Sequence, residues 1–328
     1  MTGAVRRSPT EDAQYMKRAF VFPGQGSQMP GMGRALAEAF APARYLFEEV
    51  DDALSQRLSR LMFEGPESEL MLTENAQPAL LAASLAVVRV LEGEAGFDIA
   101  RHAAYVAGHS LGEYSALAAA RALSVPDAAR LVKRRGLAMQ KAVPVGEGAM
   151  AALLGLDIEA ARGVAKAAAA GQVCAVANDN GPGQIVVSGH RAAVERAVAL
   201  AAEHGARRSI MLPVSAPFHS PLMAPAADVM ADSLAETTLE PPLVPLVANV
   251  TAAPTSDPEE IKELLVQQVT HMVRWRESVQ LFAAEAVEEV VEVGAGRVLA
   301  GLVKRIDRSL AAISVGTPAE VEALVGRL

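Results

Sequence analysis

The stretch YVAGHSLGEY at residues 105–114 decides how this chain folds. Tyr105–Ala107 is a short apolar run typical of a buried strand, and an alanine-rich, helix-favouring stretch begins at Tyr114. Between them, Gly108–Gly112 matches G-x-S-x-G, which in this strand–turn–helix context predicts a nucleophile elbow with Ser110 as the nucleophile. The alternative is a glycine-rich helix start with Ser110 as an ordinary N-cap.

Upstream of this turn the chain repeats the alternation of strands and helices. Residues 19–22 read as a buried strand that runs into the glycine-rich loop 23–28. Helical patterns cover 38–60, 75–90 and, after the turn, 126–142.

The pattern changes between residues 147 and 214. Strands are predicted at 149–156, 173–177, 184–188 and 207–214, with helices at 157–170 and 191–204. This β-α-β-β-α-β order is the ferredoxin-like signature, so we interpret 147–214 as a small ferredoxin-like domain inserted into a larger one.

The remaining residues return to the first pattern. Helices are predicted at 221–236, 258–269 and 276–285, strands at 243–249 and 287–293, and a closing helix from Val298. Strands that alternate with helices predict a mainly parallel sheet covered on both faces. The predicted fold class is therefore α/β, with an α/β-hydrolase-like large domain formed by 17–146 and 215–328.

Ser110 needs a positioned base, because a serine hydroxyl is a weak nucleophile. Among the six histidines, His219 stands out because it lies in a proline-rich loop after a predicted strand and before a helix. His109 adjoins Ser110, so its side chain is expected to leave the turn in another direction. The alternative for His219 is a surface loop histidine.

Composition excludes several classes of protein. The chain has 328 residues, of which 51% are hydrophobic, and a net charge of -8 that disfavours nucleic acid binding. Its single cysteine, Cys174, lies in an apolar run, where a buried side chain is a better interpretation than a nucleophile. No histidine, cysteine or carboxylate cluster has metal-ligand spacing, so no metal is expected.

The lack of a membrane-spanning stretch and of a secretory signal predicts a cytoplasmic protein. No window reaches the roughly 20 apolar residues of a membrane span, and the first fifteen residues lack the apolar stretch of a secretory signal. Residues 1–16 are expected to be a disordered extension, or to precede a natural start at Met16.

Three motifs together resemble one family. FPGQGSQ at residues 22–28, GHSLGEY at 108–114 and APFHSPLM at 216–223 are similar to the malonyl-CoA:acyl carrier protein transacylases and the acyltransferase domains of fatty acid and polyketide synthases. The order and spacing extend to residues 135–136, 180–188 and 291–299, so the resemblance covers nearly all of the chain from Met16. It implies transfer of malonyl from malonyl-CoA to the phosphopantetheine thiol of acyl carrier protein for fatty acid synthesis, with no cofactor.

The resemblance also implies roles for individual residues. Ser110 is the acylated nucleophile and His219 its base, while the backbone N–H groups of Gln25 and Leu111 form the oxyanion hole. Arg135 pairs with the free malonyl carboxylate, a task that suits a planar guanidinium. The backbone carbonyl of Gln268 orients the histidine. For Arg135 and Gln268 the alternatives are a solvated helix arginine and an exposed residue at a helix end.

Selectivity and docking follow from the same resemblance. Phe218 resembles the bulky residue that malonyl-selective members of the family carry before the histidine. The alternative is that Phe218 only packs within the loop. Acyl carrier proteins are acidic, so docking requires a basic surface. The candidates are the pairs Lys133-Arg134, Arg207-Arg208 and Lys304-Arg305. Two other functions stay open on the residues alone, namely a serine hydrolase acting on esters or thioesters and a non-catalytic acyl-carrier-binding component.

Overall fold

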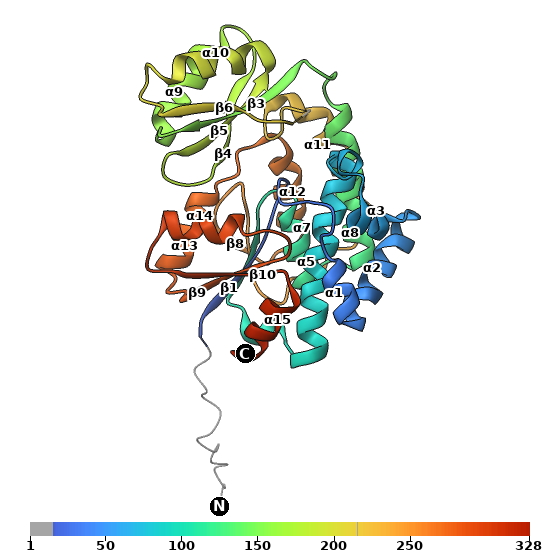
Figure 1. Ribbon diagram of the computed structural model, residues 1–328. Helices are drawn as coiled ribbons and strands as arrows, with labels where there is room; N and C mark the ends of the chain where they lie inside the picture. Colours follow the sequence, from blue (N-terminus) through green and yellow to red (C-terminus); the bar gives the residue numbers. More distant parts are fainter. Residues whose placement is uncertain (1–15, 215) are drawn as a thin grey trace, which may run out of the picture.

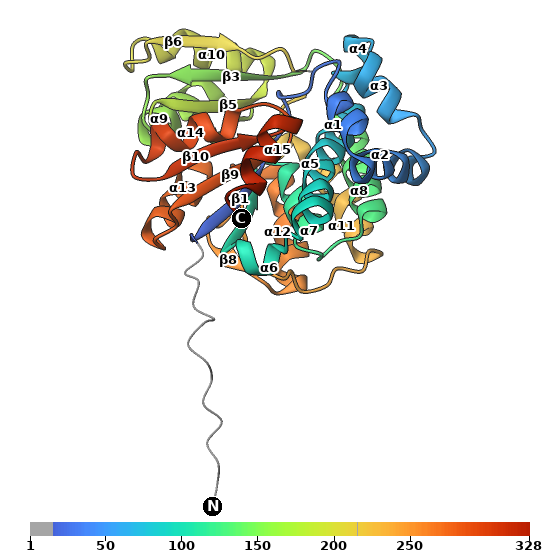
Figure 2. The same cartoon turned by 60° about the horizontal axis from the view of Figure 1, so that its bottom comes forward.

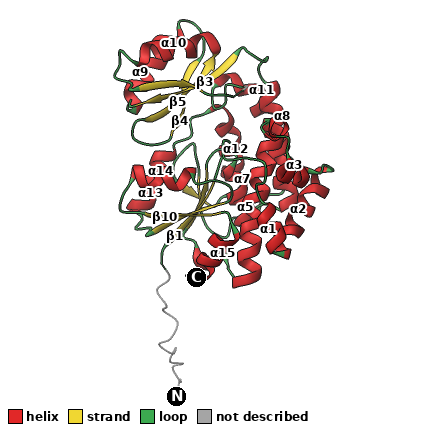
Figure 3. Cartoon of the chain, in the orientation of Figure 1, coloured by secondary structure: helices red, strands yellow, loops and turns green. Residues whose placement is uncertain are grey.

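The computed structural model describes residues 16–214 and 216–328, which form two β-sheets with helices around them (Figures 1 and 3). The larger sheet has the strand order β10-β9-β1-β2-β7-β8, with parallel pairing except for the antiparallel edge pair β7–β8. Its strands are β1 (Arg18–Phe22), β2 (Tyr105–Gly108), β7 (Leu246–Val247), β8 (Pro254–Thr255), β9 (Glu289–Val293) and β10 (Ala311–Val315).

Helices cover both faces of this sheet because successive side chains of its strands point to opposite sides. Phe20 and Phe22 of β1 belong to the core with the long helices, whereas Ala19 and Val21 face the core around Trp275. The helices of the large domain are α1 (Arg34–Ala39), α2 (Ala41–Leu54), α3 (Leu58–Glu64), α4 (Glu67–Leu70), α5 (Thr73–Ala95), α6 (Ile99–His102), α7 (Gly112–Ala119), α8 (Val125–Lys141), the 3₁₀ turn η1 (Pro221–Met223), α11 (Ala224–Ala235), α12 (Pro258–Thr270), α13 (Trp275–Ala284), α14 (Val298–Ile306) and α15 (Pro318–Val325). Figure 2 shows α13 and α14 on one side of the sheet and α5 and α7 on the other.

The smaller sheet is antiparallel and lies above the carboxyl ends of the large sheet's strands (Figure 1). Its strand order β4-β5-β3-β6 is the one that the ferredoxin-like connection produces. The elements are β3 (Gly148–Leu154), α9 (Ile158–Ala169), β4 (Cys174–Asp179), β5 (Gln184–His190), α10 (Arg191–Ala201) and β6 (Arg208–Met211). The sheet and its two helices enclose a separate apolar core.

The predicted fold class is confirmed: a mainly parallel α/β sheet carries a second, antiparallel sheet. Three element predictions were wrong. Of the strand predicted at 243–249 only β7 (Leu246–Val247) forms. The pattern at 38–60 contains parts of three helices, because Phe40 is extended before Pro42 and Ser55 adopts a left-handed conformation at φ 49°. The chain also does not close with one helix after Val298, since β10 and α15 follow α14. The prediction for residues 1–15 lies outside the described part of the chain.

Helix α5 is long and apolar enough to cross a membrane by length and composition. However, 83% of its most apolar window is buried inside the molecule. Residues such as Leu80, Leu85 and Val87 pack in the main core, so α5 is the central helix of the large domain.

Candidate active site

The turn after β2 carries Ser110 at the tip of the strand–turn–helix unit. Ser110 has φ 55°, a left-handed conformation that costs a residue with a side chain roughly 1–2 kcal/mol. The turn is so tight that a Cβ on Gly108 would lie 1.8 Å from the carbonyl carbon of Gly112. The G-x-S-x-G spacing is therefore a steric requirement of this turn.

Hydrogen bonds from two distant segments hold the strained turn in place. The Ser110 N–H donates to Asn249 Oδ1 at 2.8 Å, and the Asn249 side-chain amide donates to the Gly108 carbonyl at 2.7 Å. On the other side, Gln268 Nε2 donates to the Ser110 carbonyl at 2.9 Å. These contacts offset the conformational cost and fix the direction in which the hydroxyl points.

His219 reaches the Ser110 hydroxyl from the loop between β6 and η1. Its Nε2 lies 2.8 Å from Ser110 Oγ, and its Nδ1 lies 2.8 Å from the Gln268 carbonyl oxygen. A carbonyl can only accept, so Nδ1 carries the proton and the unprotonated Nε2 is free to accept from Oγ. Burial and the charge of Arg135 lower the pKa of His219 to about 3, so the imidazole is neutral at pH 7.

Arg135 projects from α8 into the same site and is almost fully buried, with 1% of its surface exposed. One terminal nitrogen donates to Gln268 Oε1 at 2.8 Å and to Ser110 Oγ at 3.1 Å, and the other donates to Gln77 Oε1 at 3.0 Å. The guanidinium also lies over the Tyr114 ring, 5.9 Å from its centroid. The interpretation as a solvated helix arginine is excluded by this burial.

Behind the nucleophile lies a polar network that the sequence did not reveal. Glu113, the first-turn residue of α7, is 1% exposed. Its carboxylate accepts from the Asn249 N–H at 2.6 Å and from the Gln268 side-chain amide. Burial raises the pKa of the Glu113 carboxyl above its ordinary value, while these two hydrogen bonds and the charge of Arg135 oppose the rise. Because both oxygens face donors, the geometry is that of a carboxylate. The only signal in the sequence was its position in the motif GHSLGEY.

The glycine-rich loop after β1 packs against the nucleophile turn. A Cβ on Gly24 would approach the His109 carbonyl oxygen to 2.6 Å, so glycine is required for this contact. Gln25 and Leu111 line the same cavity as Ser110. Neither of their backbone N–H groups donates to an acceptor within residues 16–214 and 216–328, so both are available to an oxyanion.

A cavity of about 520 Å³ opens at this site, between the large domain and the small one. Phe218, which is 8% exposed, lines it beside His219. The small domain contributes an apolar wall that includes Met150 and Val186. The cavity thus joins a serine–histidine pair, a buried cation and apolar side chains of the small domain.

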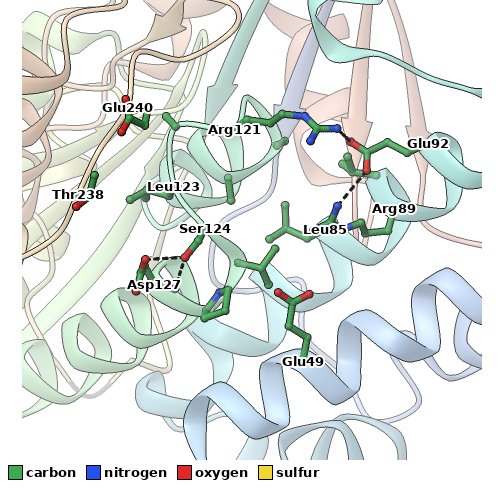
Figure 4. Close-up of a pocket in the computed structure, with 16 residues that line it drawn as sticks. Glu49, Leu85, Arg89, Glu92, Arg121, Leu123, Ser124, Asp127, Thr238 and Glu240 are labelled. Carbon is green, nitrogen blue, oxygen red and sulfur yellow. Dashed lines mark hydrogen bonds and ion pairs between the residues drawn. The ribbon is translucent and has the colours of Figure 1, made fainter.

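A second cavity, of about 430 Å³, lies at the other end of α5, α7 and α8 (Figure 4). The cations Arg89 and Arg121 both pair with Glu92, and Ser124 donates to Asp127 at the start of α8. None of the residues predicted for the site lines this cavity.

The other candidate side chains lie apart from the Ser110–His219 pair. His109 points away, toward Asn180 Oδ1 at 2.8 Å. Cys174 is partly buried on β4, and burial raises the pKa of its thiol to about 11, which leaves it uncharged at pH 7. Within the described part of the chain, no three histidine, cysteine or carboxylate side chains are grouped so that they could hold a metal ion.

Comparisons with known proteins agree with this geometry. The model of the family described as acyl transferase domain matches residues 19–328. The chain is 48% identical over 313 residues to the malonyl CoA-acyl carrier protein transacylase of Bacillus subtilis strain 168, covering 95% of this chain and 97% of the relative. It is 46% identical to the protein of that name from Escherichia coli K12, covering 93% and 97%.

Solved structures give the same picture. An acyl-carrier-protein S-malonyltransferase from Bartonella henselae is 54% identical, with a TM-score of 0.92 and coverage of 95% of this chain and 100% of the other. Another similar structure, at 43% identity and a TM-score of 0.92 with 95% and 100% coverage, is a malonyl-transacylase in complex with a type II PKS acyl carrier protein.

Proposed function

Because this chain belongs to the acyl transferase domain family and to its malonyl CoA-acyl carrier protein transacylases, we propose that Ser110 carries the malonyl group between two thiols. The enzyme transfers malonyl from malonyl-CoA to acyl carrier protein. The observation that supports the proposed residues is the contact of 2.8 Å between Ser110 Oγ and the unprotonated His219 Nε2, beside a buried arginine.

The first half of the reaction acylates the serine. His219 Nε2 takes the Ser110 proton as Oγ attacks the thioester carbonyl, and the N–H groups of Gln25 and Leu111 stabilise the oxyanion. When the tetrahedral intermediate collapses, the C–S bond breaks and His219 returns the proton to the departing coenzyme A thiolate. In the second half, the pantetheine thiol of acyl carrier protein gives its proton to His219 and attacks the ester carbonyl. The C–O bond to Ser110 then breaks and His219 returns the proton to Ser110 Oγ, which completes a ping-pong scheme.

Arg135 supplies the selectivity for an acyl group that carries a carboxylate. Among the described residues, its N–H groups contact only neutral oxygens, those of Gln77, Gln268 and Ser110. A malonyl carboxylate is a stronger acceptor, and a hydrogen bond to a charged group contributes about 1.5–3 kcal/mol. Arg135→Ala should therefore lower malonyl transfer about 10- to 100-fold relative to acetyl transfer. An unchanged ratio would remove Arg135 from this role.

The proposed reaction needs no cofactor, because the acyl group is already activated as a thioester and every proton transfer has a residue to perform it. We propose fatty acid synthesis in the cytoplasm as the setting. The similarity to enzymes of this class and the burial of α5 in the domain core support this setting.

Intact-mass measurement after mixing the chain with malonyl-CoA tests the proposal. The wild-type chain should gain the mass of one malonyl group, localised to Ser110 by peptide mapping, and should lose it on addition of the holo carrier protein. Ser110→Ala should gain nothing. Release of free malonate without a thiol acceptor would indicate a hydrolase, and the absence of any adduct would contradict acyl transfer through Ser110.

A further inference from the structure

The orientation of one side-chain amide links all three groups of the site. Gln268 Oε1 lies 2.8 Å from a nitrogen of Arg135, and arginine has only donors, so this atom must be the amide oxygen. Gln268 Nε2 then faces the Ser110 carbonyl at 2.9 Å and the Glu113 carboxylate, both of which accept. The backbone carbonyl of the same residue accepts from His219 Nδ1.

Glu113 is what makes this orientation the favourable one. Its second oxygen accepts the Asn249 N–H at 2.6 Å, so both carboxylate oxygens face donors. An amide at position 113 has only one acceptor oxygen, so its NH₂ group would oppose either the Asn249 N–H or the NH₂ group of Gln268. If Gln268 turned its amide over to avoid this, it would present the NH₂ group to Arg135 instead.

The two residues that Glu113 holds act on opposite sides of Ser110. Asn249 accepts the Ser110 N–H, and Gln268 donates to the Ser110 carbonyl. Neither contact uses the hydroxyl or the imidazole Nε2. The Glu113 backbone N–H donates to the Ser110 carbonyl at 3.1 Å. Its carboxylate makes no hydrogen bond to Ser110, His219 or Arg135 within the described part of the chain.

We propose that Glu113 is a positioning residue of the transfer reaction: by accepting one hydrogen bond from Asn249 and one from Gln268, it sets the Gln268 amide so that the Ser110 turn, the His219 imidazole and the Arg135 guanidinium are held together. This inference rests on the proposed malonyl transfer through Ser110. The wild-type chain, measured alongside, separates the two, because its failure to form malonyl-Ser110 would count against the function and not against Glu113.

Exchanging the donor and the acceptor between positions 113 and 268 tests the proposal. Glu113→Gln should lower kcat/KM for malonyl transfer about tenfold or more, the size expected when buried donors are left opposed. Gln268→Glu should also be impaired, because it sets two carboxylates against each other. The double variant E113Q/Q268E restores a donor opposite an acceptor at this contact but leaves a carboxylate oxygen facing the Ser110 carbonyl, so its kcat should exceed that of Gln268→Glu and stay below that of the wild type.

The double variant should nevertheless keep a raised KM for malonyl-CoA, because a carboxylate at position 268 competes with the substrate for Arg135. If Glu113 acted only in folding, the single and double variants would not show this pattern of changes in kcat and KM. Glu292→Gln is the matched control, since Glu292 is another buried carboxylate that accepts hydrogen bonds at both oxygens, from Leu299 and Ala300, outside the site. It should reduce the melting temperature and leave kcat/KM unchanged.

Three outcomes would overturn the proposal. They are wild-type kinetics for Glu113→Gln, a double variant no faster than Gln268→Glu, and an equal loss of activity in Glu292→Gln. If Glu113→Gln does not fold, Glu113→Ala takes its place, because it removes the acceptor without adding a donor. Full malonyl transfer by a folded Glu113→Ala would overturn the proposal as well.

Discussion

Arg135→Ala should change the pH at which Ser110 reacts, apart from its effect on malonyl binding. Burial and the Arg135 charge both lower the pKa of His219, which reaches about 3. The base works only when neutral, so reactivity is retained above this pKa and is lost as the pH falls through it. Removing the arginine removes the second largest of the causes that lower this pKa and should move the loss to higher pH.

The geometry sets the size of the effect. A terminal nitrogen of Arg135 lies 3.1 Å from Ser110 Oγ, and His219 Nε2 lies 2.8 Å from the same atom, so the two nitrogens are at most about 6 Å apart. Two unit charges at that distance interact by about 3 kcal/mol at an effective dielectric constant of about 20. This corresponds to about two pH units. The midpoint should therefore rise from about 3 to about 5.

The assay follows inactivation of Ser110 by a neutral sulfonyl fluoride, which needs the serine–histidine pair but no carboxylate partner. The wild-type rate should stay level down to about pH 5, where that of Arg135→Ala should already have fallen by about half. Arg135→Lys keeps the charge and should behave as the wild type, and circular dichroism should establish that each variant is folded at each pH. Coincident profiles for the wild type and Arg135→Ala would refute the reasoning, as would a wild-type midpoint near 6.5.

Three further predictions concern neighbouring residues. Phe218→Ser should enlarge the acyl end of the cavity and raise methylmalonyl transfer about 5- to 100-fold relative to malonyl transfer, a ratio that competition between the two thioesters measures. Asn249→Ala leaves the Ser110 N–H and the Gly108 carbonyl unpaired, so chemical denaturation should give an unfolding free energy lower by about 2 kcal/mol or more. Charge reversal at Lys304 and Arg305 should raise KM for the carrier protein with no change in malonyl-Ser110 formation, whereas reversal at the Arg207-Arg208 pair should have little effect on either.

The structure distinguishes these basic pairs by their position. Arg305 donates to Gln184 and Ile306 lies near Gly181, so the end of α14 that carries the Lys304-Arg305 pair contacts the turn at 181–184. Asn180, directly before this turn, lines the active-site cavity. Lys133 is half-buried and donates to Gln56 and Asn75. Arg207 precedes β6 and Arg208 begins it, whereas the cavity is lined by residues that follow that strand, beginning at Leu212.

Hydrophobic periodicity predicted the fold wherever a segment was long and bounded by glycine or proline. It placed the β-α-β-β-α-β order of residues 148–211 and the strand–turn–helix around Ser110. It failed where packing decides the outcome. Strand β7 is only Leu246–Val247 within a longer apolar run, and β10 was overlooked because Ala311–Val315 is short and follows a helix closely. Its assignment depends on pairing with β9, which local sequence does not encode.

The site was predictable to the extent that its chemistry resides in side chains with a distinctive motif. Ser110 and His219 carried such motifs, and the structure brings them together across 109 positions of sequence. Glu113, Asn249 and Gln77 did not, because a polar residue in a sequence looks the same whether it is solvated or buried in a network. Their role can be identified only from the structure, because a buried polar side chain must find its hydrogen-bond partners within the protein.

The electrostatic field of Arg135, which lowers the pKa of His219, also explains how malonyl is favoured in the chemical step and not only in binding. In the free enzyme Arg135 is buried, its Nε has no partner within the described residues, and its other contacts are to neutral oxygens, so its charge acts on the imidazole. A malonyl carboxylate that pairs with the guanidinium cancels most of this field. It thereby raises the basicity of His219 at the moment when the base is needed. An acetyl group leaves the field in place, so discrimination against it should appear in kcat as well as in KM.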